Sequence, residues 1–151
     1  MEYQPVPDIR DIIPHRPPFL LVDALTELQP GKRARGTKCV APDEWFLQGH
    51  FPGLPIMPGV LIIEAMAQVG AAALLAEDEY RGLRAYFAGI NRARFRRKVV
   101  PGDLLVIETE LVRKWGRMGI GAAVAMVGDK VVAEAEIMFA VEQPPNKDGK
   151  E

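Results

Sequence analysis

One uninterrupted apolar segment constrains the fold of this chain more than any other feature. Val60–Ala76 (VLIIEAMAQVGAAALLA) is 17 residues long, and only Glu64 and Gln68 in it are clearly polar. Its Ala, Leu and Met residues favour a helix, and Pro58 stands just before it, as is common at helix starts. A membrane span needs about 20 apolar residues without a central carboxylate. We therefore expect a buried helix surrounded by other elements, and no membrane span.

The segments around this helix have the composition and turn signals of strands. Asp8–Ile13 is compatible with a short helix that Pro14 closes. Strands are predicted over Phe19–Leu28, Lys32–Val40, Arg84–Val99, Asp103–Lys114, Met118–Val127 and Lys130–Val141. One long helix followed by several hairpin-connected strands predicts an α+β fold. In this fold an antiparallel sheet of about six strands wraps the buried helix.

Composition limits the classes of protein that remain. The chain has 151 residues, a net charge of −1 and one cysteine, so we expect a single domain over residues 1–151, with a frayed polar tail over 142–151. The balanced charge gives no general reason to bind nucleic acid. The single cysteine, Cys39, is expected to be a packing or an inert thiol, and its isolation fits a reducing compartment. The first residues lack the pattern of a signal peptide, so a cytoplasmic location is expected.

A loop rich in proline and glycine precedes the helix and contains one of the two histidines. The loop spans residues 42–59 and includes aromatic side chains, so we expect it to be packed inward and to build a site. His50 lies between glycines in QGHFPG and is a candidate general base. Glu64, one turn into the helix, is a candidate general acid, although a structural carboxylate is the alternative. Gly59 would offer a free N–H at the helix N-terminus to an oxyanion, or it is a simple turn residue. Together these groups suit elimination of water beside a carbonyl.

Three ordered blocks carry a resemblance to a known family. GHFPGLPIMPGVLIIEAMAQ (49–68) resembles the 3-hydroxyacyl-[acyl-carrier-protein] dehydratases of the FabZ type, and so do IIPHRPPFLLVD (12–23) and FAGINRARFRRKVVPGD (87–103). The resemblance spans about four-fifths of the chain. It implies the hotdog fold, with His50 and Glu64 matching the catalytic residues and Gly59 matching the glycine that polarises the thioester carbonyl. The reaction implied is dehydration of (3R)-3-hydroxyacyl thioesters to trans-2-enoyl thioesters in fatty acid biosynthesis.

The same resemblance implies partners. In that family the His and Glu of one site come from two subunits of a homodimer, and three dimers commonly form a hexamer. The substrate is carried on the phosphopantetheine of acyl carrier protein, and no metal or redox cofactor is expected. Acyl carrier protein is acidic, whereas residues 81–102 contain seven Lys and Arg and no acid. Arg94, Arg96 and Arg97 are the candidate contacts, and a solvated strand face is the alternative.

Several positions depart from the family pattern, and one histidine is given no catalytic role. Trp45, Leu47 and Leu54 replace residues that are usually Pro, Phe and His, and they bear on chain-length preference. The related dehydratase–isomerases have Asp and Cys in place of Glu64 and Val60, which favours a dehydratase without isomerase activity. His15, in PHRPPF, is interpreted as a structural histidine.

Two other functions remain as alternatives. A hotdog thioesterase usually relies on a carboxylate and water, so His50 argues against it. A non-catalytic acyl-thioester sensor could lose His50 or Glu64 and would be expected to carry a DNA-binding segment, for which this length has no room.

Overall fold

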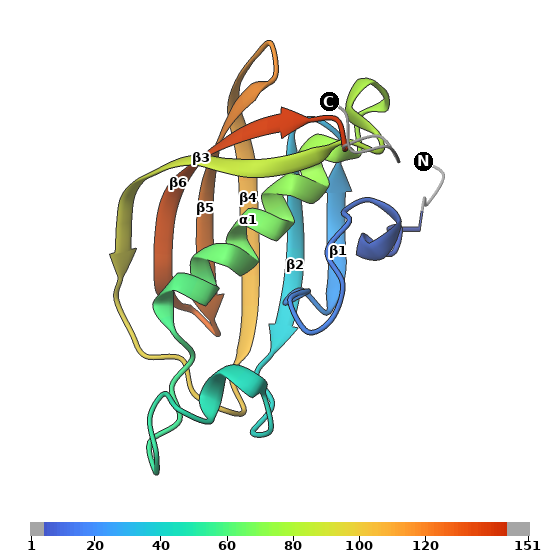
Figure 1. The fold of residues 1–151 in the computed structure, drawn as a ribbon. Coiled ribbons are helices and arrows are strands. Elements are labelled where there is room, and N and C mark those ends of the chain that lie inside the picture. The colour runs from blue at the N-terminus through green and yellow to red at the C-terminus, as the bar shows by residue number, and fades with distance from the viewer. Residues whose placement is uncertain (1–4, 145–151) are drawn as a thin grey trace.

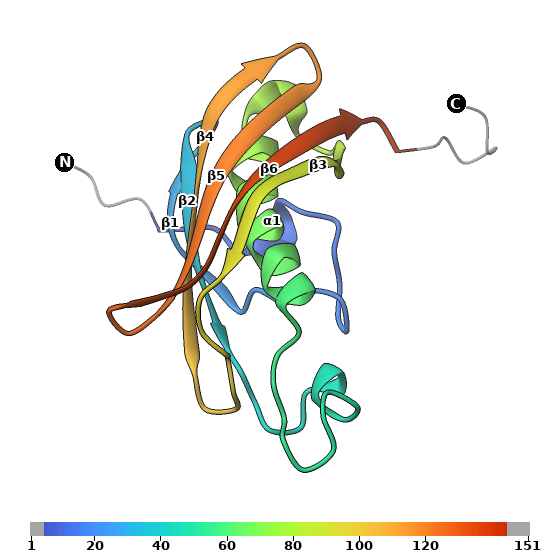
Figure 2. The same ribbon diagram turned by 90° about the vertical axis from the view of Figure 1, so that its left-hand side faces the viewer.

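The apolar segment forms the long helix α1 (Gly59–Leu75), as predicted, and thirteen of its 17 residues are buried. The computed structural model describes residues 5–144. Pro58 is the N-cap of α1, where a residue without an N–H removes no helical hydrogen bond. The helix lies against the concave face of a curved sheet (Figures 1 and 2). No helix within residues 5–144 is long and apolar enough to cross a membrane.

Six antiparallel strands form that one sheet in the order β1-β2-β4-β5-β6-β3. They are β1 (Ala24–Gln29), β2 (Arg33–Cys39), β3 (Arg84–Phe95), β4 (Leu104–Trp115), β5 (Met118–Val127) and β6 (Lys130–Glu142). The short 3-10 turns are η1 (Ile9–Asp11), η2 (Trp45–Leu47) and η3 (Asp78–Tyr80). The predicted α+β architecture of six strands around one helix is therefore confirmed.

Two strand boundaries differ from the prediction by more than one residue. β1 starts at Ala24 rather than Phe19, because the N–H groups of Phe19 and Leu20 donate to the Arg16 carbonyl in a turn. β3 ends at Phe95 rather than Val99. The Arg96 N–H still donates to the Val132 carbonyl of β6, but the Val99 carbonyl accepts the Met57 N–H from the loop before α1, so the chain has left the sheet by that point. At the first boundary, the apolar residues 19–22 look like strand from their composition but lie outside the sheet, where Leu21 and Val22 are buried.

The two ends of the described chain also refine the prediction. Asp8–Ile13 forms only the single turn η1, which Asp8 caps by accepting the Arg10 N–H at 2.9 Å. Glu142, placed in the frayed tail, is the last residue of β6, so the strand continues one residue further than predicted. Residues 145–151 of that tail lie outside the described part of the chain.

Two loops converge at the N-terminal end of α1 (Figure 2). The loop between β2 and α1 contains η2, and the segment after β3 descends to the same end of the molecule. They are joined where the Met57 N–H donates to the Val99 carbonyl at 2.8 Å. The turn η1 and the loop that follows it lie on the side of α1 away from the sheet (Figure 2). This end of the fold therefore holds the loop on which the sequence places His50.

Candidate active site

The loop that carries His50 is fixed by buried and backbone contacts. Lys38 on β2 is buried, and its Nζ donates to Glu44 Oε1 at 2.7 Å where the loop begins. Trp45 Nε1 donates to the Pro18 carbonyl at 3.0 Å, which joins the loop to the N-terminal segment. Phe46, in η2, is buried. A loop with these contacts can hold a catalytic side chain in one position.

His50 makes two polar contacts with Ile56, one through its backbone and one through its ring. The Ile56 N–H donates to the His50 carbonyl at 2.7 Å, and His50 Nδ1 lies 2.8 Å from the Ile56 carbonyl oxygen. Because a carbonyl oxygen can only accept, Nδ1 must carry the proton in that contact. The neutral imidazole then has its lone pair on Nε2, which is the form that a general base requires.

His50 and Gly59 line the same pocket, which we call the His50 pocket. Its volume is about 350 Å³, and Phe95, Arg97 and Lys98 also line it. Gly59 is the first residue of α1, where backbone N–H groups have no partner within the helix and the helix dipole is positive. The structure thus brings the candidate base and the candidate oxyanion donor together, as the sequence predicted.

Gly59 is also required by a close approach. A Cβ built on it would lie 2.7 Å from Cε1 of Phe95, whose ring covers the start of the helix. The absence of a side chain therefore lets the Phe95 ring lie directly against the first turn of α1.

Glu64 lines a second pocket, which we call the Glu64 pocket. Its volume is about 190 Å³, and His15, Gln68, Tyr86 and Phe139 also line it. Gln68, one turn further along α1, donates from Nε2 to Glu64 Oε1 at 3.0 Å. Burial raises the pKa of Glu64 above its ordinary value, and the Gln68 hydrogen bond opposes that rise. A raised pKa favours the protonated carboxyl, which is the form that can act as an acid.

The single chain does not bring the base and the acid together. His50 and Glu64 line different pockets, and neither pocket includes both residues. The Glu64 pocket borders the first half of β3 at Ala85–Phe87, whereas the His50 pocket borders its end at Phe95. The two halves of the candidate site therefore lie at opposite ends of one strand.

The predicted inward packing of the loop is only partly correct. Phe46 and Leu47 are buried, but Trp45, Phe51 and Leu54 are exposed in the single chain. Phe51 and Leu54 are exposed because residues 51–54 form a narrow turn that projects beyond the end of the sheet. The Phe51 N–H donates to the Leu54 carbonyl at 2.7 Å, and the Leu54 N–H donates to the Phe51 carbonyl at 2.8 Å.

The three basic candidates differ in their surroundings. Arg97 lines the His50 pocket, and Lys98, which was not among the three, lies beside it. Arg96 forms an ion pair with Glu134, so its charge is partly neutralised. Arg94 is exposed on β3 and donates to the Ala93 carbonyl. Of the three, Arg97 therefore has the most direct access to the pocket mouth.

Sequence reasoning missed the position of His15. Its Nε2 lies 3.7 Å from Glu64 Oε1, although 49 residues separate the two along the chain. No spacing rule pairs a loop histidine with a helical carboxylate at that separation. Cys39, the last residue of β2, is exposed, so it is not a packing thiol; that it is inert stays a prediction.

Comparison with known sequences identifies relatives over nearly the whole chain. A FabA-like domain model matches residues 13–136. The 3-hydroxyacyl-[acyl-carrier-protein] dehydratase FabZ of Clostridium novyi (strain NT) is 60% identical over 136 residues, which cover 90% of this chain and 96% of that protein. The corresponding FabZ of Clostridium botulinum (strain Loch Maree / Type A3) is 59% identical over 134 residues, covering 89% of this chain and 93% of that protein.

Comparison with solved structures supports the fold. The dehydratase heterocomplex ApeI:P from Xenorhabdus doucetiae matches with a TM-score of 0.78 at 19% identity, covering 96% of this chain and 95% of that one. The uncharacterized protein PH1136 from Pyrococcus horikoshii matches with a TM-score of 0.62 at 15% identity, covering 83% and 86% of the two chains. At these identities the likeness concerns the arrangement of the helix and sheet.

Proposed function

This chain belongs to the FabA-like family, and we propose that its His50 and Glu64 perform the chemistry of that family's reaction. The chain is a hydro-lyase that dehydrates 3-hydroxyacyl-[acyl-carrier-protein] in fatty acid biosynthesis. The observation that carries this proposal is the 2.8 Å contact between His50 Nδ1 and the Ile56 carbonyl oxygen. Because that oxygen can only accept, the contact requires a proton on Nδ1 and leaves Nε2 as a base. The proposed substrate is the (3R)-3-hydroxyacyl thioester and the product the trans-2-enoyl thioester.

The proposed reaction assigns one proton transfer to each residue. His50 Nε2 takes a proton from C2 of the acyl chain, and the Gly59 N–H stabilises the negative charge that develops on the thioester oxygen. The electron pair then forms the C2–C3 double bond as Glu64 gives its proton to the departing hydroxyl group. Water leaves, and a proton passes from the imidazolium back to the carboxylate in the resting enzyme. Acid–base groups of this kind each supply about 10²–10⁴-fold in rate.

We propose that a homodimer assembles this site from two chains. Within the described residues β3 pairs with β6 alone, which leaves a free edge of 12 residues. Tyr86, Phe87, Ile90 and Phe95 on β3 are large apolar residues that are exposed in the single chain. The other edge strand, β1, has only 6 residues. A long apolar edge is a pairing surface that monomeric proteins normally protect.

Two-fold symmetry at this edge has a direct consequence for the site. A two-fold axis pairs β3 with its copy in antiparallel orientation, so the start of one β3 lies beside the end of the other. The Glu64 pocket borders the start of β3 and the His50 pocket borders its end. Symmetric pairing therefore places Glu64 of one chain near His50 of its partner. Three such dimers in a hexamer remain a prediction from the family resemblance.

The carrier protein would approach at the mouth of the His50 pocket. Arg97 and Lys98 line that pocket and are both exposed. Basic side chains at a pocket mouth would steer an acidic carrier toward the base, mainly by increasing the association rate. Arg94 and Arg96, which precede Arg97 in the same segment, stay predicted contacts for the carrier protein. We keep the prediction that no metal or redox cofactor takes part, and a cytoplasmic location stays a prediction as well.

The function is tested by following enoyl absorbance with 3-hydroxyacyl-[acyl-carrier-protein] as substrate. His50→Ala removes the base, so kcat is expected to fall by about 10²-fold or more. Gln48→Ala, a change at an exposed position of the same loop, serves as the matched control and should keep kcat within about twofold. Near-normal turnover by a folded His50→Ala protein would remove His50 from the mechanism.

A further inference from the structure

The two histidines have different surroundings, and the mechanism above uses only one. His15 lies in the Glu64 pocket, where its Nε2 faces Glu64 Oε1 at 3.7 Å. The side chains of His15 and Glu64 are 21% and 14% exposed. A separation of 3.7 Å exceeds a normal hydrogen bond, but catalytic contacts are often long in the free enzyme and shorten when substrate binds.

Both polar contacts of the carboxyl group are made to the same oxygen. Gln68 donates to Glu64 Oε1 at 3.0 Å, and His15 faces that oxygen from the N-terminal segment. Neither contact involves Oε2. A carboxyl group held along one oxygen presents the other to the pocket, where the hydroxyl group of the substrate must lie for Glu64 to protonate it.

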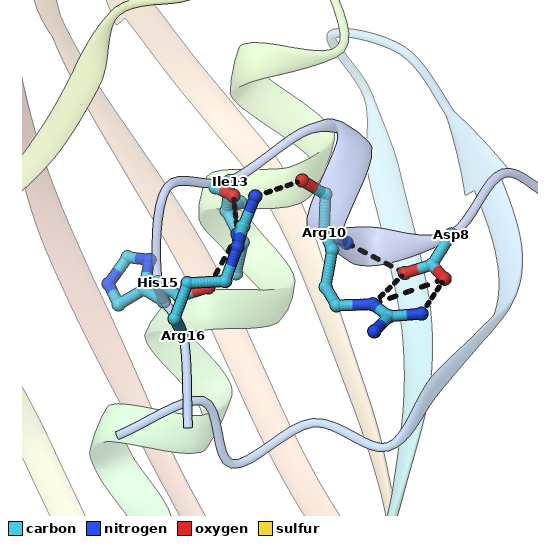
Figure 3. A network of polar contacts seen from close by, with 5 residues as sticks. All are labelled: Asp8, Arg10, Ile13, His15 and Arg16. Atoms are coloured by element: carbon cyan, nitrogen blue, oxygen red, sulfur yellow. Dashed lines mark hydrogen bonds and ion pairs between the residues drawn. The ribbon is translucent and has the colours of Figure 1, made fainter. Parts of the chain in front are cut away.

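The segment that carries His15 is built to hold the ring in place. The Arg16 guanidinium donates to the backbone carbonyls of Arg10, Ile13 and His15 at 2.9, 3.0 and 2.7 Å. Figure 3 shows this guanidinium inside the turn, with the His15 ring extending to the side opposite Asp8 and Arg10. An arginine that donates to three backbone carbonyls restricts the conformations that the turn can adopt.

Gln68 connects the same segment to α1. Its side chain is fully buried, with Oε1 accepting the Leu21 N–H at 2.8 Å and Nε2 donating to the Phe19 carbonyl at 2.8 Å. Because Gln68 also donates to Glu64, one amide group sets the position of the segment relative to the carboxyl group. His15 therefore faces Glu64 across a distance that the backbone fixes.

The protonation of the His15 ring follows from burial. Nδ1 is buried and has no hydrogen-bond partner among the described residues. An unpaired buried N–H is rarer than an unpaired acceptor, so the tautomer that leaves Nδ1 bare is favoured. Burial, with a contribution from the Arg16 charge, lowers the pKa of His15, which keeps the ring neutral. The single proton of the ring then lies on Nε2 and faces Glu64.

We propose that His15 is a positioning residue for the acid step, whose Nε2–H steadies Glu64 Oε1 and stabilises the carboxylate that remains after Glu64 has protonated the leaving hydroxyl group. This inference rests on the proposed role of Glu64. It adds a donor that touches neither substrate nor carrier. The other groups that face Glu64 are Gln68 on α1, Tyr86 on β3, which lines the same pocket, and the Arg16 charge behind His15.

The decisive variant is His15→Phe, which keeps a planar ring and removes the donor. Loss of the donor raises the pKa of Glu64 and makes it a weaker acid, so kcat is expected to fall by about tenfold, a part of the whole acid–base contribution. KM should stay within about twofold. The alkaline limb of the kcat profile, where Glu64 loses its proton, should move to higher pH. His15→Gln, which restores an N–H donor, should recover most of kcat and return the limb toward the wild-type position.

Packing effects are separated by a second substitution. The Phe19 ring stacks on His15 with centroids 6.5 Å apart, and Phe19→Leu disturbs that stacking while keeping the carbonyl that Gln68 uses. Phe19→Leu should leave the alkaline limb in place. A shift of the limb by Phe19→Leu equal to that of His15→Phe would overturn the proposal, and so would a His15→Phe enzyme with wild-type kcat and an unmoved limb. Circular dichroism of each variant establishes that it is folded.

Glu64→Gln distinguishes this inference from the function on which it rests. If Glu64→Gln is inactive and His15→Phe behaves as wild type, only the role of His15 fails. If Glu64→Gln keeps near-normal kcat, the proposed acid fails first. With Glu64→Gln already present, His15→Phe should cause no further fall in the residual rate, because the two residues act on one step. An independent tenfold fall in the double variant would contradict the proposal.

Discussion

The carboxyl group of Glu64 lies in the wall of the buried helix, where water solvates its ionised form poorly. Burial raises its pKa in the folded protein, so the folded chain holds the proton more tightly than the unfolded chain. The stability that Glu64 contributes is then fully present below its unfolded pKa and is lost as pH rises through its folded pKa. Retaining an acid at this position therefore weakens the fold at neutral and alkaline pH.

At the scale of this residue we predict that Glu64→Gln stabilises the protein in a pH-dependent way. The variant cannot ionise, so its advantage in the free energy of unfolding over wild type should be smallest near pH 4 and grow toward pH 8. Urea unfolding at several pH values and one fixed protein concentration measures this difference. An advantage that stays constant over the range would mean that Glu64 titrates alike in the folded and unfolded states.

Among the elements, the contact between α1 and the sheet depends on glycines. A Cβ built on Gly70 in mid-helix would lie 2.8 Å from both Phe139 Cζ and Thr109 Cγ2. Gly121 on β5 approaches the same two side chains, with Thr109 Cγ2 at 2.9 Å. Both side chains are buried and have little room to move. The sheet can therefore curve tightly around the helix because these positions carry no side chain.

At the scale of this element we predict that Gly70→Ala destabilises the fold although alanine is the better helix former. Ala gains about 1 kcal/mol in helix propensity, whereas overpacking costs typically 1–3 kcal/mol. A net loss of about 1 kcal/mol is expected in urea unfolding. Gly119→Ala on β5 is the control, because its nearest contact is an ordinary 3.7 Å. Equal effects of the two substitutions would show that steric fit at Gly70 is not limiting.

On the scale of the whole molecule, one chain carries two half-sites that do not meet. The prediction that follows is complementation. His50→Ala and Glu64→Gln should each be inactive alone, but mixed dimers contain one site with both native residues and one with neither. Statistical mixing makes about half of all dimers mixed, each with one native site of two, so about a quarter of wild-type activity is expected.

The measurement requires proof that subunits have exchanged. Co-expression with two different affinity tags and sequential purification isolates the mixed dimers, whose kcat per dimer should reach about half of the wild-type value. Mixed dimers without activity would mean that the sites are not shared between subunits. A protein that stays monomeric at assay concentrations would contradict pairing through β3.

The amino-acid sequence determined the parts of this protein that local chemistry controls. The run Val60–Ala76 predicted the helix to within one residue at each end, because apolar composition and a preceding proline are local signals. The hairpin β5–β6 followed from Gly128-Asp129 between two apolar segments, and its boundaries were nearly correct. His50, Glu64 and Gly59 were selected because few residue types perform this chemistry. Family and activity followed from long ordered motifs and are confirmed by the comparisons.

Only the tertiary structure decided which distant groups meet. It started β1 later than predicted, since the Arg16 carbonyl and the Gln68 side chain bond the N–H groups of Phe19, Leu20 and Leu21, and it ended β3 earlier than predicted. It placed His15 beside Glu64 and left His50 in a separate pocket at the other end of β3. The sequence contains the side chains that react, but their separation depends on how far the sheet curves around the helix. That curvature is a property of the packed chain and of no single segment.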